Sequence, residues 1–306
     1  MGKIQVHKAG TLTGHQNPIF AVENGIDPQT LYTGGNDKGV VQWNLESMAF
    51  ERILYPVQFS IYALHVIPQR PLIAIGTRDG VVSIVHTETG ALVSRLIYHQ
   101  RPVFGIETFR DKAEIVLSSE DGTVSIWNTE TFDLLYHFKV SEQTVRTIAI
   151  SPDEKWIVFG TKEGRVLLYN AQDYSLAANL PSHKMPVTSM CFSPDERYLL
   201  TGGRDAQLHV LDAKSFSMVN SFTPHLFTVY AVKYHPTLPV FATGSRDKSI
   251  KVWSADDFRL LKTISFEKGF DSHLLSVNDL VWNPYRNQLI SVSDDKQAIV
   301  WDITIG

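Results

Sequence analysis

The sequence predicts an all-β fold, a propeller of seven four-stranded blades, and three observations lead to this fold class. Seven acidic residues, each followed by a short β-rich run, recur at a constant interval that lengthens only before the last of them. Short runs rich in Val, Ile, Thr and aromatic residues alternate with turns containing Gly, Pro and Asp. The pattern contains no amphipathic helix longer than a turn or two. Repeats of about 40–45 residues are typical of four-stranded blades.

The acidic residues, called anchors below, mark the turn before the third strand of each expected blade. The first such segment runs from Asp37 to Trp43, and the last runs from Asp295 to Trp301. A histidine stands at one fixed offset before five of the anchors, as His15 does before Asp37, and a Thr or Ser stands four residues before four of them. Chance would not keep these columns in one register along the whole chain. The anchors are Asp37, Asp79, Asp121, Glu163, Asp205, Asp247 and Asp295.

Composition narrows the possible functions. The chain has 306 residues and a net charge of −4, without the basic excess that is usual in nucleic-acid binders. A single cysteine, Cys191, excludes a disulfide within the chain and fits a reducing compartment, so we expect a cytoplasmic protein. No apolar run has the length of a signal peptide or a membrane-spanning helix. We therefore expect no nucleic-acid partner and no membrane partner. Cys191 itself lies at an apolar strand position and is expected to pack in the core.

These motifs resemble the WD-repeat β-propeller family along nearly the whole chain. The resemblance implies a single domain over residues 1–306, in which the sequence repeat is offset from the structural blade. The strand-like segment 4–12 would then supply the outer strand of the last blade and close the ring, protecting its sheet edges. The residues that carry the resemblance are Gly14-His15, Thr33 to Asp37, Gln42-Trp43-Asn44, Thr243 to Asp247, Lys251-Val252-Trp253 and Trp301-Asp302.

The resemblance also implies a role for a group that looks catalytic. Ser291, His273 and Asp295 superficially match a serine-hydrolase triad. The same set recurs at the same offsets in three repeats, whereas a nucleophile is needed once, so we interpret it as a buried hydrogen-bond network and expect no catalytic residue. Leu117 interrupts the network in repeat three, and Leu211 interrupts it in repeat five. The complete sets are His15/Thr33/Asp37/Trp43, His225/Thr243/Asp247/Trp253 and His273/Ser291/Asp295/Trp301.

Two further columns identify a candidate binding face around the central channel. The position five residues after the histidine column lies near the channel mouth in the family, and four of its seven residues are aromatic. The residue just before each anchor faces the same side, and four of those seven are basic. Such side chains can anchor an interface, or the aromatic residues can simply plug the channel mouth. The two sets are Phe20, Tyr62, Phe104, Arg146, Thr188, Tyr230 and Asn278, and the basic Arg78, Lys162, Arg204 and Arg246.

The function expected from this pattern is a non-enzymatic scaffold that binds a peptide or loop of a partner protein. The partner would carry an apolar side chain that holds it at the mouth, with acidic groups nearby. The alternative is a propeller hydrolase, similar to a lactonase, with a metal in the channel. Such sites gather acidic, His or Asn residues, and the mouth column offers only Asn278 of that kind. We expect no cofactor, no metal, and a monomer on its own. The last repeat contains six extra residues, near 266–272, which are either a binding loop or a tolerated insertion.

Overall fold

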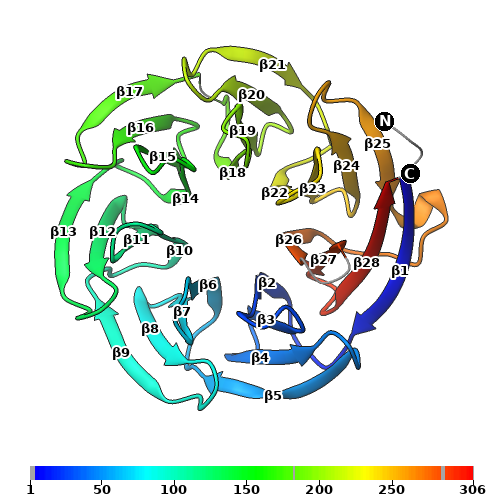
Figure 1. Ribbon diagram of the computed structural model, residues 1–306, viewed down its shortest axis with the longest axis horizontal. Helices are drawn as coiled ribbons and strands as arrows, with labels where there is room; N and C mark the ends of the chain where they lie inside the picture. Colours follow the sequence, from blue (N-terminus) through cyan, green and yellow to red (C-terminus); the bar gives the residue numbers. More distant parts are fainter. Residues whose placement is uncertain (1–3, 182, 284–286, 306) are drawn as a thin grey trace.

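The computed structural model is a ring of seven four-stranded antiparallel sheets around a central opening (Figure 1). It describes residues 4–181, 183–283 and 287–305. Residues 1–3, 182, 284–286 and 306, which the expected domain includes, lie outside the described residues. Within the described part, helical structure is confined to 3-10 turns such as η1 (Phe266–Lys268), and no helix is long and apolar enough to cross a membrane. The expected all-β propeller of seven blades is confirmed.

Each blade has an inner strand that faces the channel and a second strand packed beside it. The inner strands of blades one to seven are β2 (Ile19–Asn24), β6 (Ile61–Ile67), β10 (Val103–Thr108), β14 (Val145–Ile150), β18 (Val187–Phe192), β22 (Val229–Tyr234) and β26 (Val277–Asn283). The second strands are β3 (Thr30–Gly35), β7 (Leu72–Thr77), β11 (Glu114–Ser119), β15 (Trp156–Thr161), β19 (Tyr198–Gly203), β23 (Val240–Ser245) and β27 (Gln288–Ser293).

The third strand of each blade begins just after its anchor, and the fourth strand forms the rim. The third strands are β4 (Gly39–Asn44), β8 (Val81–His86), β12 (Thr123–Asn128), β16 (Val166–Asn170), β20 (Leu208–Asp212), β24 (Ile250–Ser254) and β28 (Ala298–Ile305). The outer strands are β5 (Ala49–Pro56), β9 (Leu92–Ile97), β13 (Leu134–Lys139), β17 (Leu176–Leu180), β21 (Met218–Phe222), β25 (Leu260–Ile264) and, for blade seven, β1 (Ile4–Leu12).

The core lies between neighbouring blades. The second strands are buried along almost their whole length, because both of their faces pack against other sheets, whereas outer strands such as β13 are mostly exposed. One apolar cluster, for example, joins Ala21 and Tyr32 of blade one to Ile61 and Ile73 of blade two. The approach between blades is close at Gly34, where an added Cβ would lie 2.7 Å from the Ile61 side chain. Glycine at this position therefore lets the second strand pack against the next inner strand.

The first strand closes the ring, as the sequence predicts. β1 pairs with β28 in antiparallel register from Ile4 opposite Ile305 to Leu12 opposite Ala298. Figure 1 shows this first strand beside the last one at the outer edge of blade seven. The side chains of Ile4, Val6 and Leu12 are buried in the adjoining core. The two ends of the described chain are thus held in one sheet.

The extra residues of the last repeat pack over this closure. Lys8 of β1 forms an ion pair with Asp271, with a distance of 2.7 Å between Nζ and Oδ2. The Phe270 ring packs edge-on against Trp301, with 6.2 Å between ring centroids, and the Lys262 ammonium lies 5.3 Å from the Phe270 centroid. Phe266 remains largely exposed. Two residues of the insertion, Phe270 and Asp271, therefore contact the seam between the first and last strands.

Candidate binding face and central channel

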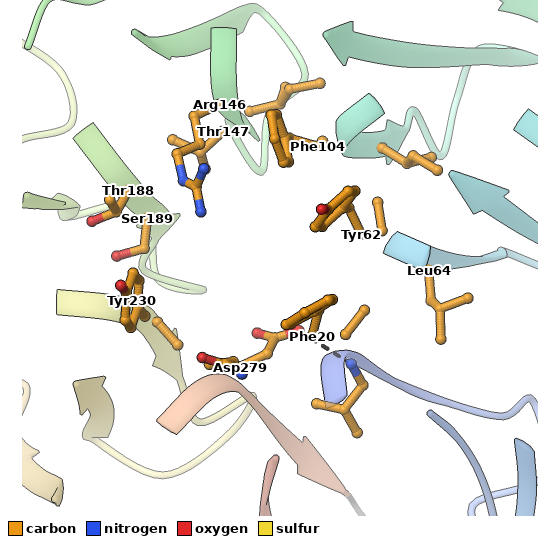
Figure 2. Close-up of a pocket in the computed structure, with 18 of the residues that line it drawn as sticks. Phe20, Tyr62, Leu64, Phe104, Arg146, Thr147, Thr188, Ser189, Tyr230 and Asp279 are labelled. Carbon is orange, nitrogen blue, oxygen red and sulfur yellow. Dashed lines mark hydrogen bonds between the residues drawn. The ribbon is translucent and has the colours of Figure 1, made fainter. Parts of the chain in front are cut away.

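The central channel contains a cavity of about 380 Å³, lined by the inner strands of all seven blades. Its wall includes every residue that the sequence places at the channel mouth (Figure 2). The structure therefore brings one side chain from each blade to the same opening. These residues are Phe20, Tyr62, Phe104, Arg146, Thr188, Tyr230 and Asn278.

Four of these side chains form a continuous stack along one side of the mouth. The Phe20 and Tyr62 rings stack at 5.4 Å with 17° between their planes, and the Tyr62 and Phe104 rings lie 5.1 Å apart at 58°. The Arg146 guanidinium lies 4.9 Å from the Phe104 centroid, in a cation–π arrangement. Burial lowers the pKa of Arg146. All four side chains are only partly buried, so the stack keeps an accessible apolar surface in a fixed shape.

The opposite side of the mouth is more polar. Thr188 donates hydrogen bonds to the carbonyls of Gly202 and Val229, at 3.1 and 2.5 Å. The Asn278 side-chain amide donates to the Ile19 carbonyl and to Asp294, each at 2.8 Å. These polar side chains are occupied in joining neighbouring blades. The mouth is therefore aromatic in blades one to three and polar in blades five and seven.

The basic residues next to the anchors lie on the same face, outside the wall of the cavity. The backbone amide of Arg204 donates to the Pro186 carbonyl at 2.8 Å, and that of Arg246 donates to the Thr228 carbonyl at 3.1 Å. These bonds join the anchor turns to the loops that lead into the inner strands, which places both on one face. Arg78, Lys162, Arg204 and Arg246 are all exposed. We call these four cations the outer ring, in which blades one, three and seven instead carry Asn36, Glu120 and Asp294.

The triad-like residues form buried networks within the blades. In blade one, His15 contacts Asp37 through Nδ1 at 2.6 Å and Thr33 through Nε2 at 2.7 Å, and the Trp43 indole donates to Thr33 at 2.7 Å. Burial lowers the pKa of His15, which favours the neutral ring. Burial opposes ionisation of Asp37, but hydrogen bonds from Asn17 and His15 outweigh it and lower its pKa.

Blades six and seven repeat this arrangement. His225 and Trp253 bond to Thr243 at 2.7 and 2.9 Å. His273 and Trp301 bond to Ser291 at 2.8 and 3.0 Å. The Ser291 side chain is fully buried, so its hydroxyl is held within the blade rather than presented to a substrate.

Blade three has a network that the sequence columns missed. Leu117 occupies the usual hydroxyl position, but Ser125 on the third strand supplies an equivalent hydroxyl. Its Oγ lies 2.9 Å from His99 Nε2 and accepts the Trp127 indole hydrogen at 2.9 Å. The prediction that Leu117 interrupts the network of blade three is therefore wrong. Because residue 125 and residue 117 are paired on adjacent strands, either one can place a hydroxyl between the two rings.

The sequence reasoning also missed a group of charged side chains deeper in the channel. The side chains of Glu23, His65, Glu107 and Lys233 stand eight residues after the histidine column, and Asp279 stands two residues earlier on its own strand. All of them line the cavity. Comparing the residues at the position eight after the histidine column, as was done for the position five after it, would have identified four of these five residues. The same position also contains Cys191, which is partly buried and packs against the cluster between blades five and six.

The charged group has more carboxylates than cations. Burial is the main reason that the pKa of Glu23 rises to about 8 and that of Glu107 to about 7. The pKa of His65 is lowered to about 4, mainly by burial and further by the positive charge of Lys233. Burial opposes the charge on Lys233, but Asp279 and Glu107 together raise its pKa. Lys233 therefore stays charged near neutral pH, while the glutamates titrate there.

The donor atoms in the channel do not form a chelating cluster. Among residues 4–181, 183–283 and 287–305, no three or more His, Cys, Asp or Glu side chains are grouped so that they could hold a metal ion. His65 Nδ1 lies 3.8 Å from Glu23 Oε2, and its Nε2 lies 2.8 Å from Thr108 Oγ1. The side chains are instead placed for electrostatic contacts with one another.

The raised pKa of Glu23 predicts an unusual pH dependence of stability. Between about pH 6.5 and 8.5 the folded protein retains a proton that the unfolded chain has already released. The contribution of Glu23 to the free energy of unfolding should therefore fall as the pH rises, by on the order of 2 kcal/mol. The buried neutral histidines, whose pKa burial lowers, oppose this trend up to about pH 7.5, because the unfolded chain still protonates them there. The Glu23 contribution is therefore measured as the difference between the wild type and a variant that lacks this carboxyl group. Urea unfolding across this pH range checks the slope.

The matched variants for this pH prediction are Glu23→Gln and Glu46→Gln. Glu23→Gln removes one titrating group, so the free energy of unfolding of the wild type relative to this variant should fall by about 2 kcal/mol from pH 6.5 to 8.5. Glu46→Gln changes an exposed carboxylate and should follow the wild type. A stability difference between the wild type and Glu23→Gln that stays constant or increases from pH 6.5 to 8.5 would contradict the prediction.

Comparison with known proteins assigns the repeat to a family. The family model described as "WD domain, G-beta repeat" matches residues 7–44, 132–170, 174–212, 216–254 and 264–302, more than half of the chain. The unmatched stretch between 45 and 131 still forms regular strands, β5 to β12, of the same ring. Comparison with curated proteins gives no match. The five matched repeats and the seven-bladed ring show that this chain belongs to the WD40 repeat family.

Proposed function

We propose that this protein is a non-enzymatic scaffold that binds a peptide or loop of a partner protein at the channel mouth. WD40 propellers are commonly protein-interaction scaffolds. The observation that carries the proposal is the stack of Phe20, Tyr62, Phe104 and Arg146 at the edge of the cavity. Aromatic and arginine side chains held in a fixed arrangement are the residues that most often dominate binding energy.

The chemistry of the face suggests the chemistry of the partner. The aromatic side of the mouth would accept one apolar or aromatic side chain, and the outer ring of Arg78, Lys162, Arg204 and Arg246 would attract acidic groups near it. In this proposal residues 1–306 act as one cytoplasmic domain, monomeric on its own. Neither nucleic acid nor a membrane is a partner in it.

The alternative, a hydrolase with a channel metal, draws on one observation, the carboxylates and histidine beneath the mouth. Elemental analysis of the purified protein would distinguish the two functions. Calcium or zinc bound in equal amount to the protein, and lost in Glu107→Gln or Asp279→Asn, would favour the enzyme.

The scaffold proposal predicts that trimming the aromatic stack abolishes partner capture. Tyr62→Ala with Phe104→Ala should reduce capture of specific partners from a cell lysate of the source organism by at least about tenfold, because the aromatic stack at the channel mouth loses two rings. Quantitative mass spectrometry of the captured proteins measures the change. Tyr136→Ala, which removes an exposed ring from the rim strand β13, is the matched control and should capture normally. Equal capture by the wild type and the double variant would exclude the mouth as the binding site.

A further inference from the structure

Five apolar side chains protrude from the loops that lead into blades five, six and seven. We name them the apolar crest: Met185, Leu226, Phe227, Leu274 and Leu275. All are exposed, Leu226 to 83% and Leu274 to 58%. They belong to three successive blades on the face that carries the channel mouth. An exposed set of this kind on one face is unusual unless it binds something.

The propeller supplies its own comparison, which shows that the fold does not need these apolar side chains. In blade six the Leu226 amide donates to the anchor Asp247 at 3.1 Å, and in blade one the Gln16 amide donates to Asp37 at 3.0 Å. The backbone bond is the same although one residue is apolar and the other is polar. The equivalent positions in blade four are Glu142 and Gln143. The apolar identity in blades five to seven therefore serves something other than folding.

Basic side chains surround the crest. Arg204 and Arg246 are exposed at the adjoining anchor turns, and Lys184 precedes Met185. Within the described part of the chain no ion pair involves any of these three cations. Lys296 is also exposed, and its backbone has a φ of 71°, as expected at the tip of a tight turn. The nearby anchor carboxylates are already paired with buried histidines. Lys248 is exposed too, beside the exposed carboxylate of Glu267. The exposed charged groups around the crest are therefore mostly cations.

The crest also lies close to the mouth along the chain. Phe227 lies three residues before Tyr230, and Leu275 lies three residues before Asn278, both of which line the cavity. A segment with one side chain in the mouth could extend directly across the loops of blades five to seven. On the other half of the face, Glu120 and Glu142 are exposed. An anionic lipid surface covering the whole face would meet these carboxylates, which disfavours a membrane.

We propose that the apolar crest binds an acidic segment of a partner protein whose apolar side chains pack on Leu226, Phe227, Leu274 and Leu275 while its carboxylates meet Arg204 and Arg246. This inference rests on the proposed scaffold function and extends its binding site from the mouth onto blades five to seven. Apolar contacts supply the affinity, and the surrounding cations select a segment with acidic residues and speed its association.

The experiment uses a phage-displayed library of random dodecapeptides selected on the full-length protein. The enriched peptides should combine Asp or Glu with Leu, Phe or Trp. Fluorescence anisotropy with one such synthetic peptide should show that Leu226→Gln with Phe227→Gln weakens binding by at least tenfold. Arg204→Glu with Arg246→Glu should weaken it similarly and reduce its salt dependence. Ile97→Gln, which changes an exposed apolar side chain on the rim strand β9, is the matched control and should bind normally.

Several results would overturn the proposal that the crest binds an acidic segment. These are no enriched peptide, enrichment of neutral or basic peptides, or unchanged affinity in the crest variants. Crest-dependent flotation with vesicles of phosphatidylcholine that contain phosphatidylserine as the minor, anionic lipid would assign the surface to lipid instead. The mouth is tested separately with the Tyr62→Ala, Phe104→Ala variant. If the peptide binds this variant more weakly but binds the crest variants as it binds the wild type, the crest is excluded and the proposed scaffold function still stands. The opposite pattern supports the crest and excludes the mouth.

Discussion

Deleting residues 1–12 should lower the melting temperature by roughly 10 °C or more, because it removes the outer strand of blade seven. The deletion exposes the edge of β28 along the register from Ala298 to Ile305. It also removes the buried side chains of Ile4, Val6 and Leu12, each of which contributes about 1.5–3 kcal/mol when fully buried. The unpaired edge should make the truncated protein prone to aggregation. Differential scanning calorimetry and light scattering measure the two effects.

A matched variant separates the loss of strand pairing from a change in surface composition. Gln5→Ala with His7→Ala alters two exposed side chains of β1 and leaves its backbone pairing intact, so the melting temperature should change by no more than a degree or two. If the truncated protein melts at the wild-type temperature, β1 does not close the ring in solution.

The second large effect is expected at the hydroxyl that joins the buried network of blade six. Thr243→Val keeps the side-chain shape but leaves His225 Nε2 and the Trp253 indole N–H without partners. An unsatisfied buried polar group costs about 1–3 kcal/mol, so the free energy of unfolding should fall by roughly 2–5 kcal/mol. Chemical denaturation monitored by tryptophan fluorescence gives the value.

Blade five provides a graded control for this substitution. Thr201 bonds to His183 at 2.9 Å, but position 211 is leucine, so Thr201→Val leaves only one group unpaired. Its expected cost is roughly 1–3 kcal/mol, less than that of Thr243→Val. Ile75→Val trims the equivalent position in blade two, where no network exists, and should cost about 1 kcal/mol. Equal losses in blades five and six would show that the tryptophan bond contributes nothing to stability.

The fold could be predicted because its determinants are periodic. A blade cannot bury its own faces, so each repeat carries the same buried positions and turns, and the period survives even in residues 45–131, where the family model finds no match. Ring closure followed from the offset between repeat and blade that the family resemblance implies. The network of blade three could not be predicted from one column, because Ser125 reaches the same point in space from the neighbouring strand.

The site was only partly predictable for a similar reason. The repeat spacing identifies one equivalent residue in each blade, and the family resemblance places that position at the channel mouth, where the structure has it. Spacing does not reveal that Phe20, Tyr62 and Phe104 stack on one another, since this depends on rotamers across three blades. Nor does it reveal the raised pKa of Glu23, because that arises from burial in a cavity enclosed by residues far apart in the sequence.

The pairing of β1 with β28 has a consequence for synthesis of the chain. β1 precedes the other strands of the ring and its partner follows them, so β1 stays unpaired while the intervening blades are translated. Blades one to six, in contrast, can each complete a sheet from consecutive strands soon after they are made. Closure of the ring therefore has to wait for the synthesis of β28, and it joins two segments that lie on either side of all the other strands. Until then β1 has unpaired backbone groups that can pair with other chains. Chaperones that bind extended segments therefore have more time to bind residues 4–12 than to bind any other strand of the ring.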